Sequence, residues 1–110
     1  MAGQTAYIAA FLEHHPEIDD SAYIEQTAAV VGAVRIGKNS TSWHQVTLRC
    51  DNHFITVGES TNIQDNSCVY LNSHDYPTVI GIHVNIGHSA LVHACHLHGH
   101  SFVGMGSIVM

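Results

Sequence analysis

Aliphatic residues recur along this chain at intervals of about six. They stand at Ile18, Ile24, Val30 or Val31, Ile36, Leu48, Val57, Ile63, Val69, Ile80, Ile86, Val92, Leu97, Val103 and Val109. A glycine often follows the aliphatic residue directly, and a small residue often comes four positions after it. This period fits neither an α-helix nor a plain strand, whose side chains repeat every 3.6 and every two residues. It predicts a short strand and a corner, repeated, with the aliphatic side chain pointing inward and glycine relieving the bend.

Three such strands make one coil of about 18 residues, so residues 18–110 form about five coils of a parallel β-helix. The fold class is therefore all-β. A sandwich of ordinary short strands is the alternative, but it does not account for glycine directly after the aliphatic residue. The period breaks at Val30 or Val31, between Leu48 and Val57, and between Leu71 and Val79. The last break contains residues 72–77, which we interpret as a loop outside the coil.

Residues 1–17 form an entry segment ahead of this single β-helix domain. Tyr7, Ile8, Phe11 and Leu12 are spaced for a helical stripe that ends at Pro16, and an extended lead-in is equally compatible. No apolar run reaches the roughly 18 residues of a membrane span. The first residues also lack the basic flank of a signal peptide.

The amino-acid composition limits the classes of function that the chain can have. Only 11% of the 110 residues are charged, against roughly 25% in an ordinary soluble domain, which predicts that subunit contacts cover much of the surface. A net charge of −6 with three basic residues argues against nucleic-acid binding. Three cysteines, an odd number, favour reduced thiols and a cytoplasmic protein. Eleven histidines are the feature that points to chemistry, because imidazole is the commonest metal ligand.

Several motifs follow one another in a specific order. They are Ile36-Gly37 with Trp43, Leu48-Arg49-Cys50-Asp51, Asn62-Ile63-Gln64-Asp65, Asp75-Tyr76-Pro77, Gly87-His88 with His93, and Val103-Gly104-Met105-Gly106-Ser107. In this set the chain, from about Pro16 to Met110, resembles the γ-class carbonic anhydrases of the hexapeptide-repeat, left-handed β-helix superfamily. The resemblance implies a left-handed prism, an exception to the usual right-handed crossover. It also implies a homotrimer with metal sites at the subunit interfaces.

The chemistry that the resemblance implies is the reversible hydration of CO2 to bicarbonate. Three imidazoles hold Zn²⁺, or Fe²⁺ or Co²⁺ in its place, and the bound water becomes a hydroxide that attacks CO2. His88 and His93 match two of these ligands, which different subunits contribute. The third ligand lies seven residues after Ile63, where this chain has Tyr70. A phenol is protonated at neutral pH and is a poor zinc ligand, so the site is expected to be weakened. Rescue by His74 or His83, or by Tyr70 as a phenolate, stays open.

Other residues match the resemblance or depart from it. By resemblance, Arg49 and Asp51 tie neighbouring subunits together, Asn62 and Gln64 line the site, and Gln64 hydrogen-bonds the hydroxide or bicarbonate. Asn62 can equally belong to a polar ladder at a coil corner. Cys50 and Ala94 stand where the family usually has glycine. The chain also ends in mid-coil at Met110, which we interpret as a truncated or unusually short form.

We therefore expect a γ-carbonic anhydrase-like metalloprotein with a weakened zinc site. A catalytically silent trimer, acting as a scaffold or binding protein, is one alternative. A hexapeptide acyltransferase using acyl-CoA, with His74 as general base, is another. His96, His98 and His100 alternate as if on one face of a strand, where they either bind metal adventitiously or simply face solvent.

Overall fold

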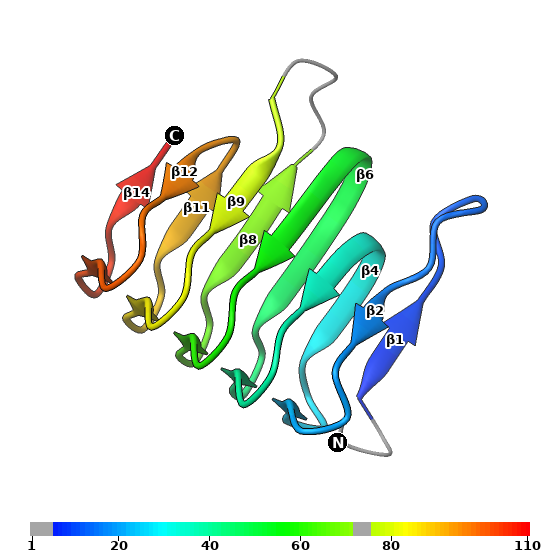
Figure 1. The fold of residues 1–110 in the computed structure, drawn as a ribbon, viewed down its shortest axis with the longest axis horizontal. Helices are drawn as coiled ribbons and strands as arrows, with labels where there is room; N and C mark the ends of the chain where they lie inside the picture. Colours follow the sequence, from blue (N-terminus) through cyan, green and yellow to red (C-terminus); the bar gives the residue numbers. More distant parts are fainter. Residues whose placement is uncertain (1–5, 72–75) are drawn as a thin grey trace.

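The computed structural model describes residues 6–71 and 76–110, and all of the regular structure in these residues is strand. The strands wind around one axis in successive coils, and every pairing between named strands is parallel (Figure 1). The predicted all-β solenoid of about five coils is confirmed. Within the described residues there is no helix long and apolar enough to cross a membrane.

Each coil contributes strands to three walls. The first wall is a five-stranded sheet of β3 (Tyr23–Ile24), β5 (Thr41–Ser42), β7 (Asn62–Ile63), β10 (Asn85–Ile86) and β13 (Phe102–Val103). The second wall contains β1 (Tyr7–Ala9), the first parts of β4 (Ala29–Ile36) and β6 (Thr47–Val57), β8 (Cys68–Leu71), β11 (Leu91–His93) and β14 (Ile108–Val109). The third wall contains β2 (Glu17–Ile18), the later parts of β4 and β6, β9 (Thr78–Ile80) and β12 (His96–Leu97).

The core lies inside the coil and is made by the residues of the six-residue period. Ile24, Leu48, Ile63, Val69, Ile86 and Val92 are all fully buried. Val30 is fully buried and Val31 is not, which decides between the two candidates at that position. Small residues occupy the corners, where the Ser40 and Ser67 hydroxyls donate hydrogen bonds to the Gly58 and Gly87 carbonyls of the next coil.

The breaks in the period correspond to corners of unequal length. Gly32 pairs with Cys50, but Val34 pairs with Ile55, so β6 turns the same corner with more residues than β4. Gly32 has φ +87°, and a Cβ there would lie 2.1 Å from the Cys50 carbonyl oxygen, so only glycine fits. Most of the loop predicted at residues 72–77 lies outside the described residues.

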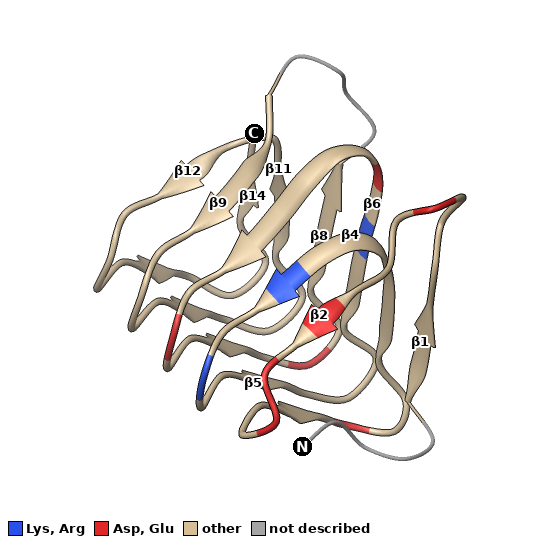
Figure 2. Cartoon of the chain, turned by 45° about the vertical axis from the view of Figure 1, so that its right-hand side comes forward, with Lys and Arg blue, Asp and Glu red and all other residues tan. Residues whose placement is uncertain are grey.

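The entry segment is extended at Tyr7–Ala9 and then turns tightly between Phe11 and His14, which form an antiparallel bridge. β1 pairs with Ala29–Val31 of β4, so the helical alternative for this stretch is wrong. Figure 2 shows that the charged residues lie on the N-terminal coils, while β9, β11, β12 and β14 contain none. The sequence has no Asp, Glu, Lys or Arg after Asp75.

Candidate metal centre

Three of the predicted site residues stand in one row on the second wall. The strand register pairs Arg49 of β6 with Tyr70 of β8, and Tyr70 with His93 of β11. Their neighbours Leu48, Val69 and Val92 point into the core, and side chains alternate along a strand. The row of Arg49, Tyr70 and His93 therefore faces outward, with Tyr70 in the middle.

The three side chains of this row form a stack. The Tyr70 and His93 rings lie 5.4 Å apart between centroids and 20° from parallel. On the other side of the phenol ring, Arg49 Cζ lies 4.6 Å from its centroid, and Arg49 Nη2 lies 3.5 Å from the hydroxyl. Tyr70 is thus held between a guanidinium and an imidazole by aromatic and cation–π contacts.

Arg49 is held by Asp51 of the same chain. Its Nε–H and Nη2–H donate to the two carboxylate oxygens of Asp51, at 3.0 and 2.8 Å. These hydrogen bonds lower the pKa of Asp51 and raise that of Arg49. The Arg49 side chain is 46% exposed and that of Asp51 is 21% exposed. Arg49 and Asp51 therefore pair within one chain. Their expected role in holding neighbouring subunits together stays a prediction.

His93 has a buried nitrogen that lacks a partner. Its Nε2 is buried and makes no hydrogen bond to the described residues, and the same holds for Oδ1 of Asn62. An unsatisfied buried polar atom is costly, and in native proteins it calls for an explanation such as an ion, a water or a further chain. His93 Nε2 therefore suits a metal ligand.

His88 lies at the corner that follows β10, beside a carboxylate. Its Nδ1 is 4.0 Å from Asp65 Oδ1, and the other Asp65 oxygen is 3.8 Å from His44 Nδ1. His44 Nε2 is in turn 3.7 Å from buried Glu25. Thr27 donates two hydrogen bonds to Glu25, which lower its pKa. At 4.0 Å the Asp65 oxygen is too far from His88 Nδ1 for a hydrogen bond, so the carboxylate lies near the ring without fixing its tautomer.

The sequence has clear similarity to known proteins, although no family model matches it. It is 41% identical over 100 residues to Gamma carbonic anhydrase 1, mitochondrial, of Arabidopsis thaliana, covering 86% of this chain and 36% of that protein. It is 33% identical over 95 residues to Carbonic anhydrase of Geobacillus kaustophilus, covering 86% and 52%. The crystal structure of a hexapeptide transferase family protein from Anaplasma phagocytophilum superimposes with a TM-score of 0.89 and 46% identity, covering 94% and 60%. This chain is a γ-carbonic anhydrase-like hexapeptide-repeat protein. It spans less than two thirds of the length of each of these relatives.

Two further residues expected from the γ-carbonic anhydrase resemblance lie on the first wall and its corner. The Gln64 N–H donates to the Ile86 carbonyl, which sets Gln64 beside Gly87, one residue before His88. Asn62 stands in β7, in register between Thr41 and Asn85, and both expectations for it, a site residue and a member of a polar ladder, stay predictions.

The remaining histidines expected near the γ-carbonic anhydrase site lie elsewhere or outside the description. His74 is outside the described residues. His83 lies in a turn at the start of β10, where its ring stacks on His100 with centroids 5.1 Å apart. His100 is in a turn with φ 65°, so its predicted place on one strand face with His96 and His98 is wrong. The strand ends at Leu97, and the chain turns through Gly99.

Ala94 and Cys50 stand where the γ-carbonic anhydrase resemblance leads us to expect glycine, and their surroundings differ. Ala94 has φ 48°, in the left-handed region that glycine adopts without strain. Cys50 is buried against the core, and burial raises the pKa of its thiol. Cys50 therefore acts as a small apolar core residue.

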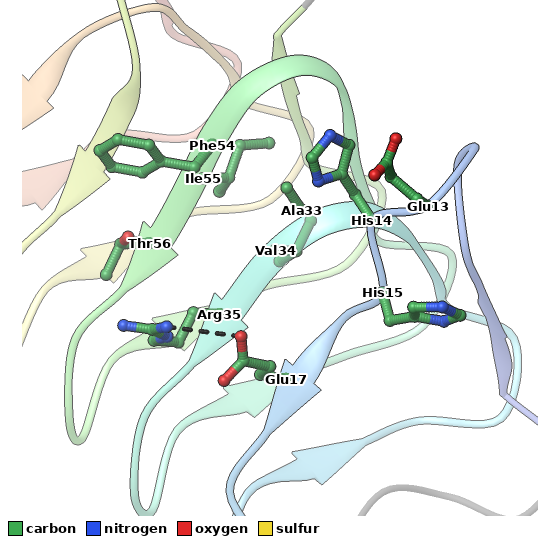
Figure 3. Close-up of a pocket in the computed structure, with 10 residues that line it drawn as sticks. All are labelled: Glu13, His14, His15, Glu17, Ala33, Val34, Arg35, Phe54, Ile55 and Thr56. Atoms are coloured by element: carbon green, nitrogen blue, oxygen red, sulfur yellow. Dashed lines mark hydrogen bonds and ion pairs between the residues drawn. The ribbon is translucent and has the colours of Figure 1, made fainter.

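A pocket of about 570 Å³ lies away from this row (Figure 3). It is formed by the entry segment and the later parts of β4 and β6, with Glu13 and His14 near one end and an Arg35–Glu17 ion pair of 3.4 Å at the other. None of its lining residues is a predicted site residue. The predicted site residues therefore lie outside this pocket.

The residues present fit a metal ion with two imidazoles rather than three. Among the described residues, no group of three or more His, Cys, Asp or Glu side chains is arranged to hold a metal. His93 offers a buried nitrogen without a partner among the described residues, and His88 lies near the carboxylate of Asp65. Tyr70, in the row with His93, offers a phenol instead of an imidazole.

Proposed function

We propose that this chain forms a homotrimer that binds Zn²⁺ weakly at the subunit interface and hydrates CO2 reversibly but slowly. His88 of one subunit and His93 of the next supply the imidazoles. The observation that carries the proposal is Tyr70, which shares a row with His93 and stacks on its ring. The family resemblance has the third histidine at this position. Its relatives in Arabidopsis and Geobacillus are named as carbonic anhydrases, which supports CO2 and bicarbonate as substrates.

The chain's own residues have distinct parts in this proposal. When bound, a zinc ion supplies the Lewis acidity that makes water a nucleophile at neutral pH. Asp65, whose carboxylate lies 4.0 Å from His88 Nδ1, would orient His88 if the two closed to a hydrogen bond, and such partners of ligand histidines typically change metal affinity 10- to 100-fold. Gln64, whose backbone lies beside Gly87, would hold an oxygen of the substrate by its side-chain amide. Arg49, fixed by Asp51, supplies a positive charge near the developing bicarbonate.

The substitution Tyr70→His tests this assignment. It restores a third imidazole at a position whose backbone pairs with β6 and β11 on both sides, so the wall need not move. We expect the parent protein to lose zinc on dialysis against a mild chelator. The variant should retain about one zinc ion per chain, as a three-histidine site does, and gain hydratase activity. Elemental analysis and stopped-flow CO2 hydration measure the two effects.

Tyr70→Phe is the matched control, because it keeps the ring stack and removes only the hydroxyl. It should bind zinc no better than the parent. Tight stoichiometric zinc in the parent, lost in Tyr70→Phe, means that Tyr70 already acts as a ligand and contradicts a weakened site. A monomer in light scattering at micromolar concentration contradicts the interface, since His88 and His93 then have no partner chain.

A catalytically silent scaffold is the second candidate, and the stack of Arg49, Tyr70 and His93 supports it. These contacts are all made within one chain, so they satisfy Tyr70 without a metal. The scaffold is favoured if the parent trimer binds no zinc at any concentration tested while the Tyr70→His variant does.

An acyltransferase is the third candidate. It rests on His74 as general base and on the Anaplasma relative, which is described as a hexapeptide transferase family protein. Binding of acyl-CoA tests it.

A further inference from the structure

Histidines are concentrated in the last coils, where other charged side chains are missing. Six of the eleven follow Asp75, namely His83, His88, His93, His96, His98 and His100. No Asp, Glu, Lys or Arg accompanies them in that part of the sequence. Two of the six, His96 and His98, lie on the third wall, outside the centre described above.

His96 and His98 flank an inward-pointing residue and therefore share the outer side of the third wall. Leu97 stands between them and packs against the core. β12 pairs with β9 so that Leu97 continues the aliphatic row from Ile80. The two imidazoles are exposed, and their ring centroids lie only 4.3 Å apart, 18° from parallel.

Nothing described around the pair competes for its nitrogens. His96 lies beside Val79 in the register of β9 and β12. The Gly81 N–H donates to the Leu97 carbonyl, so the position beside His98 is Gly81, which has no side chain. Neither imidazole makes a hydrogen bond or ion pair with the described residues; their contact is with each other.

We propose that His96 and His98 chelate a divalent copper or nickel ion. An ion bound about 2 Å from one nitrogen of each ring lies about 3 Å from each ring centre. If the two nitrogens meet the ion at a right angle, the ring centres are about 4.5 Å apart, as in the square-planar or tetragonal sites of Cu²⁺ and Ni²⁺. The separation of 4.3 Å matches this arrangement. The stacked pair His83 and His100, at 5.1 Å, is too wide for it.

Binding requires the rings to turn, because an ion cannot lie in the planes of two nearly parallel rings. The rotation is about the Cβ–Cγ bond, whose torsion is broad for histidine, and exposure leaves it unhindered. Two protein nitrogens leave the other coordination positions to water or to a ligand that the ion brings with it. The site is thus a reversible surface chelate, selective for Cu²⁺ over Zn²⁺ by the usual order of affinities, and it does not depend on the site at Tyr70.

The experiment uses the full chain and Cu²⁺ as the probe, in a buffer that does not bind copper. At substoichiometric Cu²⁺, paramagnetic broadening of backbone amide NMR signals locates the ion, and we expect it at residues 96–98 and 79–81. Calorimetric titration then gives the affinity. His96→Gln and His98→Gln should each weaken binding at this site at least about tenfold, because each removes an intramolecular second ligand. The double variant should lose little more than either single one, since one substitution already abolishes the chelate.

His53→Gln is the matched control, because His53 is an exposed imidazole that contacts a phenyl ring and, among the described residues, no second imidazole. It should leave copper affinity unchanged, and so should His100→Gln. Unchanged copper affinity in His96→Gln and His98→Gln overturns the proposal. Broadening centred on His88 and His93, or a loss in His100→Gln as large as in His98→Gln, also overturns it. Additive losses in the double variant mean two separate one-nitrogen sites and overturn it as well.

Discussion

The same three strands, β6, β8 and β11, form both sides of the second wall, but the residues on its inner and outer sides are constrained differently. On the inner side, Leu48, Val69 and Val92 repeat one kind of residue in successive coils, and all are fully buried. On the outer side, the next residues are Arg49, Tyr70 and His93, which differ in charge, shape and chemistry. The inner row is constrained by packing density, so each coil must supply a similar aliphatic volume. The outer row is constrained only by its own contacts.

This difference explains how the chain keeps the fold while changing the site. Tyr70, which stands where the family resemblance has a histidine, lies on the outer row, away from the core residues Leu48, Val69 and Val92. The new ring is accommodated by stacking between Arg49 and His93. We therefore expect substitutions in the outer row to change the predicted metal site with little effect on the core.

The largest expected effect comes from the inner row. Leu48→Ala should lower the free energy of unfolding by about 2–5 kcal/mol, because it removes a fully buried side chain and leaves a cavity. Urea denaturation followed by circular dichroism measures the loss. The matched variant is Leu91→Ala, the same substitution at an outward-facing, half-buried position of β11.

Leu91→Ala should cost less than about 1 kcal/mol if its side faces solvent, as ordinary surface positions do. Equal losses in the two variants contradict the contrast between inner and outer rows. A loss at Leu91 that depends on protein concentration shows instead that a second chain covers this wall, and it locates the subunit interface.

A smaller effect is expected at the corner where β4 bends. Gly32→Ala places a Cβ 2.1 Å from the Cys50 carbonyl oxygen, at a φ of +87°. The backbone of two walls must shift, so the loss of stability should exceed the roughly 1 kcal/mol of an ordinary glycine effect. Thermal unfolding measures it.

Gly106→Ala separates the effect of backbone strain from the effect of the steric clash that Gly32→Ala creates. Gly106 also has a positive φ, +73°, but nothing lies within 4 Å of the Cβ position. It carries the backbone penalty alone and should be the milder substitution. If the two variants lose the same stability, the backbone around Gly32 and Cys50 shifts without a measurable cost in free energy. That result contradicts the steric clash expected from the register of β4 and β6.

The sequence predicts the inward-facing residues better than it predicts the contacts of the outward-facing ones. The six-residue period identifies the inner row because burial enforces it in every coil. It leaves Val30 and Val31 undecided, since both are aliphatic, and only the pairing with Leu48 separates them. The outer contacts carry no period, so the arrangement of Glu25, His44, Asp65 and His88 was missed. Its only signal is a spacing of roughly one coil between His44, Asp65 and His88.

The same reasoning explains the error at His100. Alternation predicts a shared face only while the strand continues, and β12 ends at Leu97. Gly99 could have indicated the turn, because glycine commonly marks the point where a strand gives way to a turn. The stack on Tyr70 was also beyond the sequence: the resemblance identified which residue was replaced, and only the register showed what the replacement contacts.

The smallest effect concerns Asp51, and its dependence on pH makes it measurable. Hydrogen bonds from Arg49 hold the pKa of Asp51 below its ordinary value. A carboxyl group with a lowered folded-state pKa contributes its full stabilisation above the unfolded-state pKa, which is about 3.9. It loses that contribution as the pH falls below about 4, through the folded-state value. Asp51→Asn removes the contribution altogether.

The parent and Asp51→Asn should therefore differ in unfolding free energy at pH 6 by at most about 1 kcal/mol, because Arg49 is nearly half exposed and solvent screens the pair. The difference should shrink towards zero at pH 3. Glu17→Gln is the control, since its ion pair with Arg35 is longer, 3.4 Å, and both side chains are about two-thirds exposed; it should show almost no difference at either pH. A loss of 3 kcal/mol or more in Asp51→Asn at pH 6, which about matches a buried pair with one partner removed, means that a neighbouring subunit covers Arg49. The outer row is then an interface, as the γ-carbonic anhydrase resemblance predicts.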